Sequence, residues 1–266
     1  KVLIEPGVPD DTCEYCRTGR YNICPGVDFM ATQPNYKGAL TQYMTHPEEW
    51  TYHIPEGMTT MEGALVEPAA VGMHAAVLGG AQPGKSIVIL GGGTIGLMVL
   101  QACISLGATD ITVVDVIEKR LELAKKLGAA RVINGKEEDT VAVLRSEEMY
   151  GDHGVDLVFE AAGAVFTAQQ AVQIVSRGGK IMMVGTQSKP VPIDFLKINR
   201  EVTIQTSFRY CNNFPQTIEA ISSGRFNVKD MVTNIYDYED VQKAFEEAID
   251  PVKKTEMVKG VIKVAE

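Results

Sequence analysis

Three cysteines near the start of the chain have the spacing of metal ligands. Cys13 and Cys16 are separated by two residues, Cys24 follows after seven more, and Asp10 extends the series by a carboxylate. A structural zinc takes four ligands, and thiolates and carboxylate oxygens both serve. The pattern therefore predicts a structural zinc held by Asp10, Cys13, Cys16 and Cys24. The alternative is a lobe with three free thiols. A redox-active pair is disfavoured, because the surrounding Pro, Gly, Asp and Thr residues indicate a loop.

A glycine-rich stretch further along the chain predicts a phosphate-binding turn. The apolar run 86–90 leads into Gly91, Gly93 and Gly96, and a run of helical composition follows. In this setting the first glycine permits a tight turn, the second lets the backbone approach a pyrophosphate, and the third lets the helix pack on the strand. The positive end of the helix then favours the phosphates. The predicted dinucleotide contacts here are Gly91, Gly93, Thr94, Ile95 and Gly96.

An acidic residue after the next strand points to the ribose of that cofactor. Asp115 follows the run 111–114 and lies nineteen residues after Gly96, where a carboxylate binds the ribose hydroxyls. A carboxylate repels a 2′-phosphate, so NAD is favoured over NADP. The alternative role for Asp115 is a helix cap. Arg120 is a candidate for stacking on the adenine side, with a solvated helix face as the equal alternative.

These residues need a framework of alternating strands and helices. Strand-like runs occur at 86–90, 111–114, 155–159, 180–184 and 202–208, with helical segments such as 118–127 and 167–175 between them. Such alternation predicts an α/β fold with a doubly wound parallel sheet. Ligands lie at the carboxyl ends of strands in such sheets. The strand ends carry the remaining predicted cofactor contacts, which are Glu160, Gly163, Gly185 and Phe208.

The segment from 37 to 55 has a different character. Apolar and polar residues alternate briefly between Pro and Gly residues. This pattern predicts a string of short strands, as in a small β-barrel. His46 and His53 have no partner at ligand spacing, so structural roles are expected for both.

Composition narrows the classes of function. The 266 residues are 45% hydrophobic and carry a formal net charge of −9, which makes nucleic acid and anionic membranes poor partners. No apolar run reaches the roughly 18 residues of a membrane-spanning helix. No export signal is visible, so a cytoplasmic location is predicted. The chain begins at Lys1 without Met, for which a removed export signal and a missing N-terminal segment are the two explanations.

Together these motifs resemble the zinc-dependent medium-chain dehydrogenase/reductase family, and within it the sorbitol (polyol) dehydrogenase branch. The family-level similarity rests on the cysteine series, residues 37–43 and 54–57, and the glycine-rich turn with Asp115. The branch-level similarity rests on residues 5–9, Gly19 to Asn22, 64–68, 71–75 and Phe208 to Asn212. The resemblance covers the whole chain.

The resemblance implies a Rossmann sheet plus the remainder of a GroES-like β-barrel catalytic domain. It suggests three parts: 1–70 as a partial catalytic domain with the zinc lobe, 71–208 as the NAD-binding domain, and 209–266 as a return to the catalytic domain. Glu67 matches a position that contributes to the catalytic zinc. Arg209 and Tyr210 resemble substrate contacts, with Arg209 also near the nicotinamide, and Phe29 matches an aromatic wall of the substrate pocket.

The activity implied is oxidation of a polyol to a ketose by zinc-assisted hydride transfer to NAD. The partners implied are a small polyol or ketose and further copies of the chain in a dimer or tetramer. Threonine or butanediol dehydrogenase is the alternative within the family. No cysteine precedes Cys13 and no histidine precedes His46, although the family takes catalytic zinc ligands from that region. The chain is therefore expected to be a fragment, lacking about the first third of a full-length relative, and a nucleotide-binding chain without turnover is a further alternative.

Overall fold

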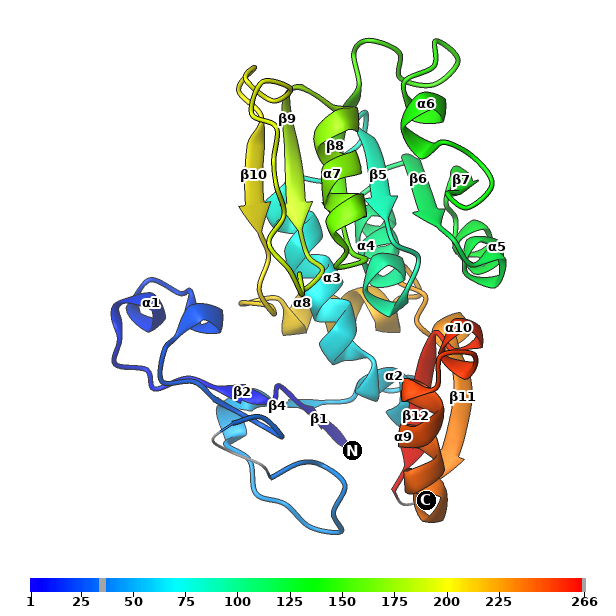
Figure 1. Cartoon of the computed structure of the whole chain (residues 1–266). Coiled ribbons are helices and arrows are strands. Elements are labelled where there is room, and N and C mark those ends of the chain that lie inside the picture. Colours follow the sequence, from blue (N-terminus) through cyan, green and yellow to red (C-terminus); the bar gives the residue numbers. More distant parts are fainter. Residues whose placement is uncertain (34–36, 265–266) are drawn as a thin grey trace.

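The computed structural model describes residues 1–33 and 37–264. Its larger part is a six-stranded parallel sheet, which occupies the upper half of Figure 1. In spatial order the strands are β10 (Thr203–Thr206), β9 (Val175–Met183), β8 (Val155–Glu160), β5 (Ser86–Leu90), β6 (Asp110–Asp115) and β7 (Arg131–Asn134). The chain order reverses between β5 and β8, so the predicted doubly wound α/β fold is confirmed.

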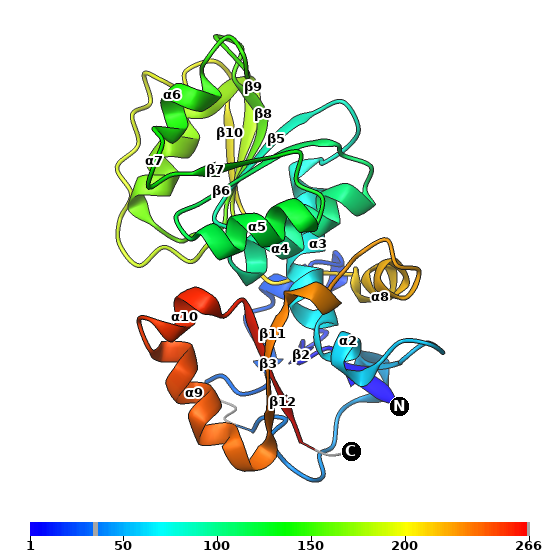
Figure 2. The same cartoon turned by 90° about the vertical axis from the view of Figure 1, so that its right-hand side faces the viewer.

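Helices cover both faces of this sheet, as Figure 2 shows. Ile87 and Ile89 of β5 pack with α3 (Val66–Gly79) and α4 (Thr94–Ser105). Val88 and Leu90 belong to the core on the other face, which includes residues of α6 (Thr140–Leu144) and α7 (Val165–Ile174). Helix α5 (Glu118–Lys126) connects β6 to β7. Because successive side chains of a strand point to opposite faces, an uninterrupted apolar run fits a strand covered on both sides.

Segments from both ends of the chain form the lower part of the molecule. Strand β1 (Val2–Ile4) pairs antiparallel with β4 (Thr51–His53), and β2 (Gly7–Val8) pairs antiparallel with β3 (Asp28–Phe29). The C-terminal strands β11 (Val232–Asp237) and β12 (Lys259–Lys263) pair in parallel. The short helices here are α1 (Glu14–Arg17), α2 (Thr60–Ala64), α9 (Val241–Ile249) and α10 (Lys253–Glu256), with 3₁₀ turns η1 (Tyr21–Ile23), η2 (Glu48–Trp50), η3 (Lys229–Met231) and η4 (Tyr238–Asp240). Helix α1 lies in a lobe at the left of Figure 1.

Helix α3 joins the two parts and is packed tightly against the sheet's helical layer. A Cβ on Gly72 would lie 2.5 Å from the carbonyl carbon of Met98 in α4, so only glycine allows this approach. The Lys180 ammonium in β9 donates to the carbonyl of Leu78 at 2.9 Å. Helix α8 (Phe214–Ser222) lies against α3, and the Asn213 side chain before it donates to the carbonyl of Ala70 at 3.0 Å.

Two expectations about local structure were wrong. Residues 37–47 contain no strand, so the predicted string of short strands reduces to β4. These residues have the alternating pattern of a strand, but none of the sheets in the described parts of the chain includes them. The segment expected to be helical up to Val175 ends at Ile174, and Val175 already begins β9, which runs through Gly178 and Gly179.

No helix in the described parts of the chain has both the length and the apolar character needed to cross a lipid bilayer.

Candidate functional site

The glycine-rich turn lies between β5 and α4, at the carboxyl edge of the sheet. Gly91 has a φ of 112°, and a Cβ there would lie 2.8 Å from the amide nitrogen of Ala162. A Cβ on Gly96 would overlap the carbonyl oxygen of Gly91. Both positions therefore exclude larger residues. Gly93 is the N-cap of α4, and its side-chain-free backbone leaves the first amides of the helix accessible to an anion.

Asp115 ends β6 beside this turn. Its Oδ2 accepts a hydrogen bond from the amide of Gly92 at 2.7 Å, and its Oδ1 accepts from the amides of Val116 and Ile117 at 2.8 and 2.9 Å. The Arg120 guanidinium is 3.8 Å from Oδ2. The carboxylate thus holds the glycine-rich turn against the end of β6, and its negative charge stands at the mouth of the cleft beside it.

That cleft has a volume of about 460 Å³ and lies at the carboxyl ends of β5, β6 and β8. Its lining includes Gly91, Gly93, Asp115, Arg120, Ala162 and Phe166. Arg120 Nη2 also donates to the carbonyl of Lys254 at 3.1 Å, and its buried Nε has no hydrogen-bond partner. Arg120 therefore connects the cleft to α10 rather than lying on a solvated helix face.

Glu160 lies fully buried at the end of β8 and its carboxylate is occupied by the protein. Oε1 accepts from the amides of Ala162 and Gly163 at 3.0 and 2.9 Å and from the Thr167 hydroxyl at 2.7 Å. Oε2 accepts from the Gln187 side chain at 2.7 Å. Glu160 therefore shapes the loop at the strand end, with its oxygens directed to the protein.

Gly163 and Gly185 meet directly at this strand end. A Cβ on Gly185 would overlap the amide nitrogen of Gly163, whose own φ is 69°. These two glycines allow the loops after β8 and β9 to come together.

A second group of polar residues gathers where α3 begins. Glu67 lies in the first turn of α3, and burial raises the pKa of its carboxyl, opposed by Lys259, the Tyr210 phenol and Arg209. Tyr210 is only 2% exposed, and burial and the charge of Glu67 raise the pKa of its hydroxyl. Arg209 Nη1 is buried without a hydrogen-bond partner, and the Tyr210 hydroxyl, which also makes no close hydrogen bond, has the Glu67 carboxyl as its polar neighbour. Such unpartnered polar groups are costly in a protein interior and are natural contacts for a polar ligand.

Arg209 lies close to two aromatic rings. Its guanidinium carbon is 4.0 Å from the centre of the Phe29 ring and 4.7 Å from that of Phe208. Phe29 belongs to β3 and Phe208 to the segment after β10, so the two rings come from different parts of the molecule. Phe208 is 52% exposed. The stacking holds the guanidinium in place while leaving the outer ring accessible.

Lys259 is a site residue that the sequence analysis missed. It lines a cleft of about 420 Å³ with Thr94 and Lys254, and its positive charge lowers the pKa of Glu67 against the effect of burial. The Thr94 hydroxyl donates to the carbonyl of Val258, the residue before Lys259. This contact connects the start of α4 with the group around Glu67. A lone lysine in a C-terminal strand belongs to no motif, so only the fold reveals its neighbours.

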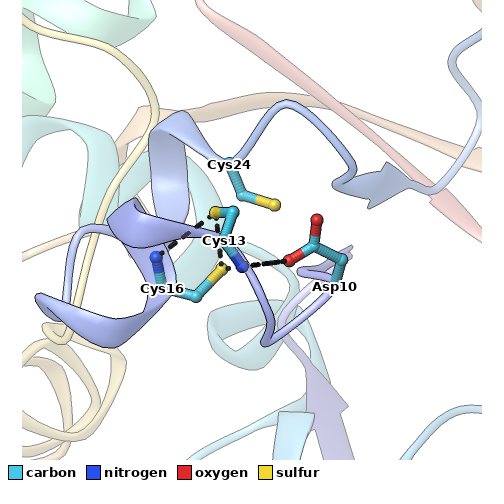
Figure 3. Close-up of side chains that lie close together, drawn as sticks. All are labelled: Asp10, Cys13, Cys16 and Cys24. Atoms are coloured by element: carbon cyan, nitrogen blue, oxygen red, sulfur yellow. Dashed lines mark hydrogen bonds between the residues drawn. The ribbon is translucent and has the colours of Figure 1, made fainter.

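The predicted metal ligands come together in the lobe around α1 (Figure 3). One ligand atom from each of Asp10, Cys13, Cys16 and Cys24 lies within 4.8 Å of the others. The thiols of Cys13 and Cys16 are 3.4 Å apart, and that of Cys16 is 3.6 Å from Asp10 Oδ1. This set of one carboxylate and three sulfurs fits a tetrahedral zinc. The lone His46 and His53 lie outside it, and His46 Nε2 is hydrogen-bonded to the carbonyl of Glu5 at 2.9 Å.

The charge state of these ligands suits a metal. The amides of Thr12 and Cys13 donate to Asp10 and lower the pKa of its carboxyl to about 2. The amide of Cys16 lowers the pKa of the Cys13 thiol. Desolvation and the neighbouring thiols raise the pKa of Cys16 to about 12 in the metal-free cluster. A cation would reverse that last effect, because three sulfurs this close favour ionisation only when a positive charge lies between them.

Among the described residues, this is the single group of three or more potential ligands. Glu67 therefore has no two further cysteine, histidine or carboxylate ligands grouped with it. A catalytic zinc takes about three protein ligands, so these residues alone do not fit one.

Two protein-family models match the chain. One, described as an alcohol dehydrogenase GroES-like domain, matches residues 1–56. The other, described as a zinc-binding dehydrogenase, matches residues 94–223. The first covers the lobe and the small strand pairs, and the second covers most of the parallel sheet.

Individual proteins similar to this chain are also dehydrogenases or dehydrogenase-like proteins. A zinc-type alcohol dehydrogenase-like protein of Escherichia coli (strain K12), itself uncharacterized, is 64% identical over 266 residues, which are 100% of this chain and 76% of that protein. Sorbitol dehydrogenase of Bacillus subtilis (strain 168) is 41% identical over 252 residues, 94% of this chain and 70% of that enzyme. A crystal structure of an Escherichia coli oxidoreductase/dehydrogenase of unknown specificity superimposes with a TM-score of 0.96 at 63% identity, covering 100% of this chain and 75% of that one.

Proposed function

Because this chain belongs to the zinc-binding dehydrogenase family, we propose that it serves the NAD-dependent oxidation of a secondary alcohol of a polyol to the ketose. The observation that carries this proposal is the group formed by Glu67, Arg209 and Tyr210. It contains buried polar atoms without a hydrogen-bond partner, and its Glu67 carboxyl is influenced by the charge of Lys259, which follows the Thr94–Val258 contact at the start of α4. The relative named sorbitol dehydrogenase supports the choice of a polyol over other alcohols.

Each residue of the group has a proposed role. Arg209 Nη1 and the Tyr210 hydroxyl donate hydrogen bonds to polyol hydroxyls, which removes the cost of leaving them unpartnered. Phe29 forms a wall on which Arg209 rests, so the guanidinium keeps one orientation. Holding the carbinol carbon in one position is the main contribution that such residues make to rate.

The cofactor proposed is NAD, and the cleft beside the glycine-rich turn fits it. The amides at the start of α4 would bind the pyrophosphate, and Asp115 would accept hydrogen bonds from the adenosine ribose. The fixed charge of Asp115 disfavours a 2′-phosphate. Gly163 and Gly185 keep the strand-end loops clear of the nicotinamide side, near Phe208 and Arg209. When bound, NAD accepts the hydride, while the protein supplies orientation and charge.

Zinc is proposed in two roles. Asp10, Cys13, Cys16 and Cys24 would hold a structural zinc. Glu67 would contribute one carboxylate to a catalytic zinc, which acidifies an alcohol when it is present. Since the described residues group no further ligands with Glu67, we expect these 266 residues alone to bind NAD without oxidising polyols. We also propose a cytoplasmic location and a dimer or tetramer, which fractionation and light scattering can test.

The decisive experiment compares two proteins after zinc addition. One is the 266-residue chain, and the other is that chain joined to the part of the Bacillus subtilis sorbitol dehydrogenase that it does not cover. We expect NADH formation with sorbitol and xylitol from the joined protein only, and Glu67→Gln should abolish it. A preference of the joined protein for threonine or 2,3-butanediol would overturn the polyol assignment. Rapid polyol turnover by the chain alone would show that the catalytic metal has been misplaced.

A further inference from the structure

Two segments far apart in the sequence are joined by hydrogen bonds in both directions. We call residues 19–22 the lobe turn and residues 208–212 the arginine segment. The Asn22 side chain donates to the carbonyl of Phe208 at 2.9 Å. In return, the Asn212 side chain donates to the carbonyl of Gly19 at 2.6 Å, and the Asn212 amide donates to the Tyr21 hydroxyl at 2.8 Å. The Cys211 thiol also donates to the Gly19 carbonyl, at 2.9 Å.

The lobe turn is part of the metal-ligand loop. It lies between the ligands Cys16 and Cys24, and backbone hydrogen bonds connect it to both ends. The amide of Gly19 donates to the carbonyl of Cys16 at 3.0 Å, and the amide of Cys24 donates to the carbonyl of Tyr21 at 3.0 Å. A metal that fixes the two cysteines therefore also fixes the ends of this turn. Without it, the ends of this short loop would be less ordered, because loops with few buried apolar contacts open at a low free-energy cost.

The arginine segment needs such support. Arg209 has a φ of 53° and Asn212 a φ of 54°, in the left-handed region that side chains other than glycine disfavour. Conformations of this kind persist only when their surroundings hold them. The bonds to the lobe turn begin at Phe208 and end at Asn212, so they hold the segment on both sides of Arg209.

The lobe turn is itself anchored on one side by a buried carboxylate. Tyr21 donates to Glu5 at 2.7 Å, and Tyr52 donates to the same carboxylate at 3.0 Å. The Tyr21 ring also packs edge-on against Trp50, with ring centres 4.8 Å apart. The turn is thus held by a fixed anchor at Tyr21 and by the metal ligands at its two ends. Its position depends on both.

From these contacts we infer that metal binding in the lobe is coupled to the conformation of the arginine segment, so that the metal lobe is a positioning element for Arg209. The assignment of Arg209 to the substrate rests on the proposed function, but the coupling itself does not. Coupling is reciprocal. A metal that stabilises the contact between the two segments must bind less tightly when that contact is weakened.

The test measures zinc affinity of the 266-residue chain by competition with a chromophoric chelator. Asn22→Ala removes one bond to the arginine segment without touching a metal ligand or a left-handed residue. The matched control is Asn227→Ala, which removes a side-chain bond of 2.8 Å to Asp230 far from the lobe. We expect Asn22→Ala to weaken zinc binding roughly three- to tenfold, the value of one neutral hydrogen bond, and Asn227→Ala to leave it unchanged. Equal zinc affinity in the wild-type chain and Asn22→Ala would overturn the inference.

A second measurement uses only the wild-type chain, in case Asn22→Ala does not fold. Trypsin cleavage after Arg209, followed by mass spectrometry, reports the order of the arginine segment directly. Removing zinc with a chelator should speed this cleavage severalfold, while cleavage after the exposed Arg200 stays the same. Equal rates at Arg209 with and without zinc would overturn the coupling. Neither measurement uses a polyol or a nucleotide, so an absence of polyol turnover would count against the proposed function only.

Discussion

The guanidinium of Arg209 lies 4.0 Å above the ring of Phe29, which brings together two residues from opposite ends of the chain. The centre of the Phe208 ring is also close, at 4.7 Å, so the charge is held against two aromatic rings. Desolvation at this position lowers the pKa of Arg209, yet an arginine keeps its charge under all ordinary conditions. The stacking therefore presents a permanent cation in a defined orientation.

Replacing this arginine by lysine should show that the planar group matters as well as the charge. A lysine ammonium cannot stack flat on an aromatic ring or offer a planar set of donors. Arg209→Lys should lower the free energy of unfolding in urea by about 1 kcal/mol, the order of one cation–π contact. In a protein that turns polyols over, kcat/KM should fall about tenfold. The exposed Arg200, whose side chain donates to its neighbour Asn199, provides the control Arg200→Lys; an equal effect there would contradict the stacking argument.

Nucleotide preference should depend on the charge of Asp115. Calorimetric titration should give NAD an affinity at least about tenfold above that of NADP, since one charge repulsion of about 1.4 kcal/mol suffices for this. Asp115→Asn keeps an acceptor for the Gly92 amide but removes the charge, so the ratio of NAD affinity to NADP affinity should fall. The control Asp152→Asn, on an exposed turn, should leave that ratio unchanged. Equal binding of both nucleotides by the unmodified chain would exclude the ribose role of Asp115.

Metal analysis of a preparation made without chelators should find about one zinc per chain. Cys24→Ser should lose most of it, and Asp10→Ala should lower occupancy less severely, because three sulfurs remain. Cys103→Ala is the matched control, since Cys103 is buried within α4 and away from the cluster. A wild-type chain that contains no zinc would support the alternative of a lobe with three free thiols.

Acidification should release that zinc through its thiols rather than through Asp10. The pKa of Asp10 is already about 2, so its carboxylate stays ionised down to strongly acidic pH. Thiolates must take up protons when the metal leaves. Zinc affinity should therefore fall as the pH is lowered from 8 to about 5. Asp10→Asn should bind zinc less tightly, but its affinity should depend on pH in the same way. A zinc affinity of Asp10→Asn that does not change with pH would show that Asp10, and not the thiols, takes up the proton.

Glu5 should make stability depend on pH. Burial raises the pKa of its carboxyl despite the bonds from Tyr21 and Tyr52. The folded chain therefore favours the protonated group, and the stability this provides is present below the unfolded-state pKa and is lost as the pH rises through the folded-state value. Glu5→Gln cannot ionise. Relative to the wild-type chain, it should become more stable as the pH rises above 4.5, the ordinary value.

The measurement for Glu5 is urea unfolding followed by fluorescence of Trp50, the one tryptophan in the sequence. Because Trp50 packs against Tyr21, its emission reports the neighbourhood of Glu5. The exposed Glu219 provides the control Glu219→Gln. If the free energy of unfolding of Glu5→Gln differs from that of the wild-type chain by the same amount at every pH, Glu5 does not titrate in this range.

The sequence predicts the parallel sheet well because its signals are local. The run 86–90 is apolar after its first residue, Ser86, and strand β5 has these bounds. Strand β7 was missed because Arg131–Asn134 is short and half polar, so only its pairing with β6 makes it a strand. The segment 37–47 shows the reverse case, because it has a strand-like pattern but joins none of the sheets in the described residues.

Some features of the candidate site could likewise be predicted from local sequence, and others could not. The four metal ligands could be predicted because they lie within fifteen residues of one another, and the structure brings them together. The contact between the lobe turn and the arginine segment could not, because hydrogen bonds between distant loops leave no spacing pattern. Glu160 was correctly predicted to lie at a strand end. Its four hydrogen bonds to the protein could not be predicted, because they depend on the conformation of the loops around it.

Helix α3 has a mechanical consequence. Since Gly72 brings its backbone against Met98 and Lys180 holds its far end, α3 would move as one body with the parallel sheet. Glu67, in its first turn, would travel with the glycine-rich turn in any rotation of the two parts. The arginine segment is tied to the lobe turn, and the neighbouring Asn213 is tied to Ala70 of α3. Helix α3 therefore relates Glu67 both to the nucleotide cleft and to the segment that carries Arg209, so a displacement of α3 would disturb the cleft and the polar group around Glu67 together.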